Sequence, residues 1–275
     1  MTISASLPAG ACDCHIHIYD YARFSLAPTA LSTPPQALWS DYRREQQALG
    51  LTRAVVVQPT GYAFDNRCTL DALAQAQGLA RGIVVVPPDI GEQALAAMDE
   101  AGVRGVRFML IPNSGSVMRW DMLASLAAMI APLGWNINLQ IDGRDFAQHE
   151  ARLKSLPCRV VIDHNGKFLT PVAPDAPAMQ SLLRLLDSGR CWIKLSAPYE
   201  TSQTGAPSYD DVGALARTFA QAYPERCLWA SNWPHPGRSP QPSNSDLLEL
   251  LPSWAPSAAT RQRILVDNPA ELYRF

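Results

Sequence analysis

Two histidines, His15 and His17, lie two residues apart in the segment Asp-Cys-His-Ile-His, which ends a short apolar run near the start of the chain. On a β-strand, residues i and i+2 point to the same side, so both imidazoles are expected to face one small volume. Imidazoles gathered in this way can polarise a carbonyl oxygen or bind a metal ion. Cys12 and Cys14 are expected to point to the opposite side of the strand.

Eight short apolar runs alternate with segments of helical spacing along the 275 residues. Several runs, such as Ala54–Val57, are continuously apolar, which is typical of parallel strands covered on both faces. The expected strands are Ala11–Tyr19, Arg53–Gln58, Arg81–Val86, Gly105–Leu110, Asn136–Ile141, Arg159–Asp163, Cys191–Ser196 and Cys227–Ser231. The expected helices are Asp41–Leu49, Leu70–Leu79, Glu92–Ala101, Asp121–Leu133, Ala178–Leu186, Asp210–Ala222 and Ser257–Leu265. This alternation predicts a single (β/α)8 barrel domain over residues 1–275, with the Pro-rich segments 28–35 and 234–242 as loops over its mouth.

Polar side chains follow most of the expected strands, and in this fold the active site lies at the carboxyl ends of the strands. Four of the five histidines fall on this surface, whereas His149 lies in a helical stretch and is expected at the surface of the protein. The candidate site residues, in chain order, are His15, His17, Asp65, Arg107, Gln140, Asp163, His164, Lys167, Lys194, Tyr199, Asn232 and His235.

Each candidate also has a structural interpretation. His164 could be a hydrogen-bonded core histidine, His235 could brace a turn, and Arg107 could pair with Asp99 or Glu100. Lys194 alternates with apolar neighbours, so its side chain could enter the barrel and neutralise a buried carboxylate. Their common position at one end of the barrel favours a functional site over a separate structural role for each residue.

Two kinds of chemistry fit these residues. His15, His17 and His164 would form the usual protein ligand set of a catalytic zinc ion with an open position. However, a metal-dependent barrel hydrolase would need a carboxylate base after the eighth strand, and Asn232 is neither a base nor a good metal ligand. We therefore expect that no cofactor is bound and that the histidines polarise a carbonyl directly, with zinc as the alternative.

Without a metal, the remaining candidates divide into a base and an anchor for the substrate. Asp65 is the first choice for the general base and Asp163 the second, although Asp163 is more readily explained as the residue that orients a histidine. Arg107 and Lys167 offer cationic anchoring for a substrate carboxylate.

Composition limits the partners of the chain. The formal net charge is −2, without a basic excess for nucleic acid, and no apolar run is long enough to span a membrane. Residues 1–10 do not read as a secretory signal, and the six cysteines are spread without a Cys-x-x-Cys motif. These features predict a cytoplasmic protein with thiols in its core and a small-molecule partner, a lactone or a carboxylate.

Five motifs resemble the amidohydrolase superfamily, and in particular its branch of small lactone-processing enzymes, which includes pyrone-dicarboxylate lactonase and galactarolactone isomerase. The motifs are Asp-Cys-His-Ile-His at 13–17, Val-Gln-Pro…Asp-Asn at 57–66, Gly-Val-Arg-Phe at 105–108, Val-Ile-Asp-His-Asn-Gly-Lys at 161–167 and Asn-Trp-Pro-His at 232–235. The resemblance implies a distorted barrel and chemistry that often proceeds without metal. It also implies that His15, His17 and His164 polarise the lactone carbonyl and that Arg107 holds a carboxylate.

The resemblance leaves two reactions open. Hydrolysis of a small anionic lactone, derived from a sugar acid or a dicarboxylic acid, is the first prediction. Interconversion of lactone ring sizes is the alternative, because segments 166–168, 199–202 and 232–235 are similar to the isomerase type. Asn232 replaces the aspartate that serves as base in the lactonase type and is predicted to be catalytic, while Gln140, Tyr199 and His235 are predicted to contact substrate. A barrel that binds a metabolite without catalysis is a further alternative.

Overall fold

The computed structural model describes residues 7–275 and shows eight parallel strands in a single sheet, in the order β1 to β8. The strands are β1 (Cys12–Ile16), β2 (Arg53–Val57), β3 (Ala80–Val84), β4 (Val103–Met109), β5 (Asn136–Gln140), β6 (Arg159–Ile162), β7 (Cys191–Ser196) and β8 (Cys227–Ala230). Seven parallel ladders join neighbouring strands in sequence order. The prediction of a distorted (β/α)8 barrel is confirmed.

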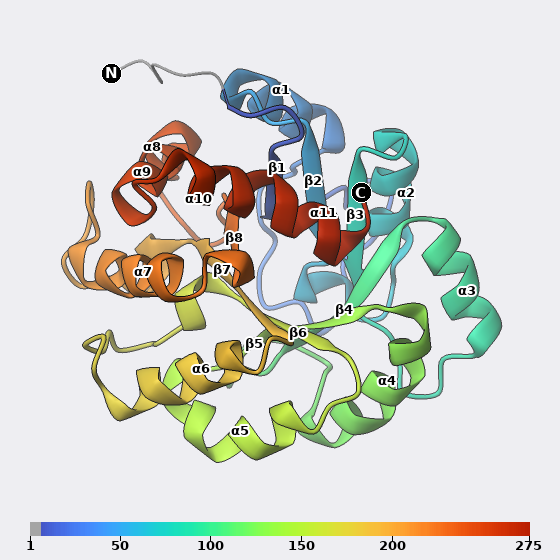
Figure 1. Cartoon of the computed structure of the whole chain (residues 1–275). Coiled ribbons are helices and arrows are strands. Elements are labelled where there is room, and N and C mark those ends of the chain that lie inside the picture. The colour runs from blue at the N-terminus through green and yellow to red at the C-terminus, as the bar shows by residue number, and fades with distance from the viewer. Residues whose placement is uncertain (1–6) are drawn as a thin grey trace.

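Helices surround the ring of strands (Figure 1). The α-helices are α1 (Trp39–Leu49), α2 (Arg67–Ala76), α3 (Glu92–Glu100), α4 (Leu123–Ile130), α5 (Phe146–Lys154), α6 (Pro177–Asp187), α7 (Asp210–Ala222), α8 (Asn244–Glu249), α9 (Leu251–Trp254), α10 (Ala258–Gln262) and α11 (Asn268–Tyr273). Short 3-10 turns occupy Thr60–Tyr62, Trp120–Met122, Ala131–Leu133, Gly143–Asp145, His164–Gly166, Pro198–Glu200 and Pro224–Arg226, and a π-helical turn spans Arg263–Asp267. None of the helices described is both long and apolar enough to cross a membrane.

A helical stretch was expected around His149, but the bounds of helix α5 were not predicted, because its surface is mostly polar and only Phe146 and Leu153 are buried. The expected helix over residues 121–133 is present, with α4 at its centre and a 3-10 turn at each end. His149 lies on α5, where its ring stacks on Trp120 with the ring centroids 3.8 Å apart, so this histidine is half-buried rather than free at the surface.

The barrel is sealed between β1 and β8 by two backbone hydrogen bonds. The amide of Asn232 donates to the carbonyl of His15 at 3.0 Å, and the amide of His17 donates to the carbonyl of Trp233 at 2.8 Å. Three of the four residues that contribute backbone groups to this seam, all except Trp233, were predicted to form the site with their side chains.

Two apolar clusters fill the structure. The larger lies between strands and helices, and the smaller is formed by inward-facing residues of the barrel together with Leu272 and Tyr273. All six cysteines are buried and unpaired, as predicted. Burial of apolar area on this scale is the main source of stability for such a fold.

Candidate active site

A bulge in β1 turns the first two histidines into the barrel. The register with β2 shifts between Asp13 and Ile16. Cys12 and Cys14 belong to the inner cluster, and His15 also faces inward, toward residues of β6 and β7. The expectation that the two cysteines face away from the histidines was therefore wrong, because a bulge inserts one extra residue and reverses the alternation of sides.

Asp13 holds the bulge in place. Its Oδ1 accepts hydrogen bonds from the backbone amides of His15 at 3.2 Å and of Ser231 at 3.0 Å, and Tyr42 donates to its Oδ2 at 3.3 Å. Burial raises the pKa of Asp13 to about 6, although these hydrogen bonds oppose the change. The local shape of β1 thus depends on partners from α1 and from the end of β8.

Three imidazoles gather at the carboxyl ends of β1 and β6. The Nε2 atoms of His15 and His17 are 3.3 Å apart, and the ring centroids of His15 and His164 are 4.8 Å apart. His17 and His164 line a cavity, whereas His15 is fully buried behind them. The structure thus brings the three predicted histidines together, with His15 as the support for the other two.

The three rings are uncharged. Burial lowers the pKa of His17 to about 3, and the positive charge of Arg107 adds to the effect. Burial also lowers the pKa values of His15 and His164 well below their ordinary range, and the nearby lysine Lys194 contributes to both. Neutral imidazoles can donate one hydrogen bond and accept another, which suits the binding of a carbonyl oxygen.

Below His15, a cluster of fully buried polar side chains fills the centre of the barrel. Lys194 Nζ lies 3.1 Å from Asp163 Oδ1 and 3.1 Å from His15 Nδ1. Asn138 accepts from this ammonium and donates to Asp163 Oδ2 at 2.8 Å. Burial raises the pKa of Asp163, but Lys194 and the neighbouring His15 and His164 together outweigh it and hold the pKa well below the ordinary value. The interpretation of Lys194 as the partner of a buried carboxylate is confirmed.

Arg107 is a buried cation that has no carboxylate within contact distance among residues 7–275. Its side chain donates to the carbonyl of Gln58 at 2.9 Å and to Oε1 of Gln140 at 3.4 Å, and its Nε has no hydrogen-bond partner in this part of the chain. Asp99, a predicted structural partner, pairs instead with Arg104 and Arg274. A buried guanidinium without a carboxylate is a ready binding site for an anionic group of a ligand.

Lys167 and Glu200, which line the same cavity as Arg107, form an ion pair. Burial lowers the pKa of Lys167 to about 8, with Asp163 opposing the change. Asn232 Nδ2 donates to Glu200 Oε1 at 3.1 Å. Glu200 is therefore the carboxylate that lines the cavity, and Asn232, the predicted catalytic amide, orients it.

A chain of hydrogen bonds supports Asn232 from behind. Asn232 Nδ2 also donates to the hydroxyl of Tyr199 at 2.9 Å, and this hydroxyl lies 2.8 Å from Nδ1 of His235. His235 Nε2 is 2.9 Å from Oδ1 of Asn244, whose amide nitrogen donates to Glu45. The predicted substrate contacts Tyr199 and His235 thus brace Asn232, and neither residue lines the cavity.

The cavity has a volume of about 270 Å³. Its base carries the polar residues, and its rim includes Leu31, Ser32, Pro34, Pro236 and Gly237 from the two Pro-rich segments that were predicted to lie over the mouth. The complete lining is His17, Tyr19, Leu31, Ser32, Pro34, Pro59, Thr60, Gly61, Arg107, Met109, Ser114, Gln140, His164, Lys167, Glu200, Asn232, Pro236 and Gly237.

Asp65 does not line the cavity. Its carboxylate is bound by Arg67, with Arg67 Nη2 at 2.7 Å from Asp65 Oδ2 at the surface of the protein. The bonds to Arg67 lower the pKa of Asp65. The structure thus removes the geometric basis for Asp65 as the base, and the position beside the cavity belongs to Glu200.

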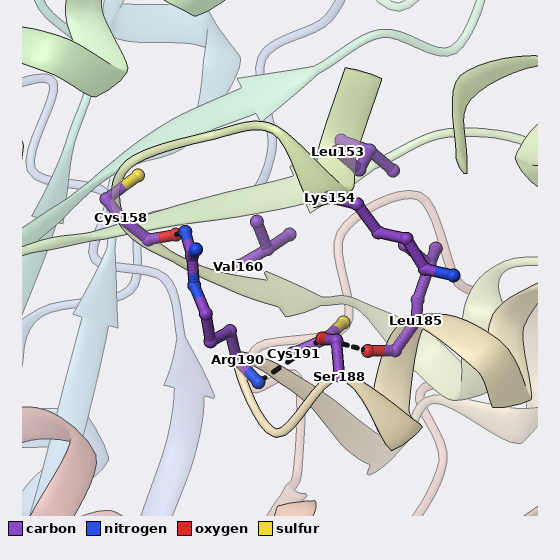
Figure 2. Close-up of a pocket in the computed structure, with 8 residues that line it drawn as sticks. All are labelled: Leu153, Lys154, Cys158, Val160, Leu185, Ser188, Arg190 and Cys191. Atoms are coloured by element: carbon purple, nitrogen blue, oxygen red, sulfur yellow. Dashed lines mark hydrogen bonds between the residues drawn. The ribbon is translucent and has the colours of Figure 1, made fainter. Parts of the chain in front are cut away.

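A second pocket, of about 260 Å³, lies where β6 and β7 begin, at the opposite end of the barrel (Figure 2). Arg190 at this pocket donates to the carbonyl of Cys158, and Ser188 donates to the carbonyl of Leu185. These groups bind backbone carbonyls and are therefore structural. The chemistry of the barrel lies at the cavity that the histidines line.

Comparisons with known proteins place this geometry in a family. The family model described as amidohydrolase matches residues 12–275. D-galactarolactone isomerase of Agrobacterium fabrum is 34% identical over 275 residues, covering 98% of this chain and 93% of the relative. 2-Pyrone-4,6-dicarboxylate hydrolase of Comamonas testosteroni is 34% identical over 277 residues, covering 97% and 91%. A crystal structure of an Agrobacterium tumefaciens protein without ligand superposes with a TM-score of 0.92 at 33% identity, covering 98% of this chain and 97% of the other. The chain belongs to the amidohydrolase family.

Proposed function

We propose that this protein is an enzyme that attacks the carbonyl of a small anionic lactone. The observation that carries the proposal is one cavity lined both by neutral imidazoles and by a buried arginine that has no carboxylate partner among residues 7–275. The relatives support it, because one is named as a hydrolase of a pyrone dicarboxylate and another as an isomerase of a sugar-acid lactone.

The substrate is oriented by its charge. A carboxylate of the lactone binds Arg107, with Gln140 beside it, and the ring carbonyl points toward Nε2 of His164, while His17 lines the same cavity. When the Ser196 hydroxyl donates to His164 Nδ1, from which it lies 2.9 Å away, His164 carries its hydrogen on Nε2 and can donate to the carbonyl oxygen. A donor of this kind stabilises the oxyanion that forms when the carbonyl is attacked.

Glu200 is the general base of the proposed reaction. It removes a proton from the nucleophile, whose oxygen then bonds to the carbonyl carbon to form a tetrahedral oxyanion. Collapse of this intermediate breaks the ring C–O bond, and the Lys167 ammonium supplies a proton to the leaving oxygen. Asn232 contributes by orienting Glu200 through the hydrogen bond at 3.1 Å.

Hydrolysis and ring isomerisation differ only in the nucleophile. Water gives an open-chain acid, whereas a hydroxyl of the substrate gives a lactone of different ring size. We propose hydrolysis as the first candidate, and the resemblance of residues 199–202 and 232–235 to the isomerase type favours ring isomerisation as the second candidate. Proton NMR of galactarolactones, glucarolactones and pyrone dicarboxylate incubated with the purified protein distinguishes the two products. Absence of any conversion across this panel would contradict both reactions.

The donor set at the histidines does not fit zinc. His15, Asp163 and His164 are close enough to one another to hold an ion. However, Lys194 places an ammonium at 3.1 Å from both His15 Nδ1 and Asp163 Oδ1, so the carboxylate is already neutralised by a fixed cation. We therefore propose that the reaction uses no metal.

Metal removal tests this part of the proposal. Protein dialysed against a chelator is expected to keep its turnover, because the base, the acid and the oxyanion donor of the proposed steps are all side chains of the protein. Elemental analysis before and after dialysis checks that metal was removed, and addition of Zn²⁺ to the dialysed protein serves as the control. Stoichiometric zinc whose removal abolishes turnover would contradict the proposal.

The proposed acid predicts a pH dependence. Lys167 donates a proton only in its charged form, so kcat is expected to fall as the pH rises through the pKa of Lys167. Burial places this pKa at about 8, and the carboxylate of Glu200 favours the charged form, so the fall is expected at or above about pH 8. A kcat profile from pH 6 to 10 measures it. Lys167→Met should lower kcat and remove this alkaline limb, and persistence of the limb in the variant would assign it to another group.

A further inference from the structure

The centre of the barrel holds a positive charge that the proposed reaction does not consume. Lys194 is fully buried, and its ammonium contacts three acceptors: Asp163 Oδ1, His15 Nδ1 and Asn138 Oδ1. An ammonium has three hydrogens, so all three are used. A buried lysine in an otherwise apolar floor is costly unless it is paired in this way.

The contacts around Lys194 define which nitrogen of each histidine carries hydrogen. His17 Nδ1 lies 2.7 Å from the carbonyl of Val57, which can only accept, so the hydrogen is on Nδ1 and Nε2 of this neutral ring is an acceptor. His15 Nε2, 3.3 Å away, must then donate to it. His15 Nδ1 is consequently an acceptor, and the ammonium of Lys194 is the donor that reaches it.

The opposite assignment leaves a conflict. If His15 donated from Nδ1 to Asp163, across 3.3 Å, two nitrogen lone pairs would face each other between His15 and His17 with no hydrogen between them. A metal ion or an extra proton would be needed to relieve this repulsion. The presence of Lys194 removes the need for either.

We propose that Lys194 is a built-in cation that replaces a metal ion in this site: it neutralises Asp163, fixes His15 as a donor from Nε2, and prevents the cluster from binding a divalent metal. Lys194 is a positioning residue, since it acts on the cavity through His15 and His17. The inference deepens the proposed metal-free reaction, but its readouts need no substrate, so it can fail independently of the lactone chemistry.

The first test is metal binding. Lys194→Met keeps the length of the side chain and removes the charge, which frees Asp163 and His15 Nδ1. We expect this variant to bind about one zinc ion per chain, at least about 10-fold more tightly than the unaltered protein. Lys154→Met removes the same charge from an exposed ion pair on α5 and should bind zinc as the unaltered protein does. Equal affinity in Lys194→Met and the unaltered protein would overturn the proposal.

The second test reads the histidine tautomers directly. Long-range ¹H–¹⁵N spectra of metal-free protein labelled in histidine, with His15 assigned from a His15→Gln variant, should show His15 hydrogenated at Nε2 and His17 at Nδ1. In metal-free Lys194→Met, His15 is expected to carry hydrogen on both ring nitrogens, donating to Asp163 from Nδ1 and to His17 from Nε2. If His15 of the unaltered protein already carries its hydrogen on Nδ1, the proposal is wrong, and this result decides the matter even if Lys194→Met does not fold.

Discussion

Glu200→Gln is expected to lower kcat by about 10²- to 10⁴-fold, the usual contribution of a positioned general base. Glutamine keeps the shape of the side chain and its contact with Asn232, but it cannot accept a proton from the nucleophile. Binding of a non-reactive anionic analogue should change little, because Arg107 supplies the main attraction. Steady-state kinetics together with calorimetric titration of the analogue separate the two effects.

Asp65→Asn is the matched control for this experiment. It makes the same chemical change at a carboxylate that is bound by Arg67 outside the cavity. Its turnover should stay close to that of the unaltered protein. A loss of turnover in Asp65→Asn equal to that in Glu200→Gln would return Asp65 to the role of base and contradict the assignment of Glu200.

Arg107→Met is expected to lower kcat/KM for an anionic lactone by about 30- to 5000-fold, which corresponds to about 2–5 kcal/mol for a buried charge pair that loses one partner. The same variant should lose much less on an uncharged lactone of similar size, because only the charged substrate uses the guanidinium. The ratio of kcat/KM for the two substrates is therefore the informative measurement. An unchanged ratio would show that Arg107 does not recognise the carboxylate.

Arg107→Lys refines this result. Lysine keeps the charge but cannot form two parallel hydrogen bonds with a carboxylate. An intermediate ratio is expected, since the attraction remains while the orientation of the lactone is lost. Arg119→Met is a suitable control because Arg119 is exposed and pairs with Asp121 at the surface.

Much of the fold follows from patterns that are local in the sequence. Continuous apolar runs such as Ala54–Val57 report burial on both faces, and their alternation with helical segments is sufficient to predict a parallel barrel. Helix α5 shows the limit of this approach. Its polar surface carries little periodicity, and its position is determined by packing of Phe146 and Leu153 against the rest of the protein.

The bulge in β1 could not be predicted from the local sequence pattern. Strict alternation places Cys14 and His15 on opposite sides, and only the extra residue lets both face the interior. The groups that hold the bulge, Ser231 and Tyr42, are distant in the sequence from Asp13. A single strand therefore does not contain the information that directs its side chains.

The base illustrates a similar limit for the site. Asp65 and Glu200 both follow strands, and sequence position does not tell which carboxylate turns inward. Arg67, two residues away, draws Asp65 outward, while Asn232 and Lys167, from two other strand ends, hold Glu200 at the cavity. The histidines were easier to predict, because their chemistry and their spacing both pointed to the same end of the barrel.

The hydrogen bonds between β1 and β8 have a consequence for refolding. The amides and carbonyls that complete the ring belong to His15, His17, Asn232 and Trp233, three of which also carry predicted site side chains. A partly folded chain with this seam open cannot align the imidazoles with the amide that orients Glu200. Recovery of turnover after dilution from denaturant should therefore coincide with closure of the ring and lag behind the return of helical circular dichroism.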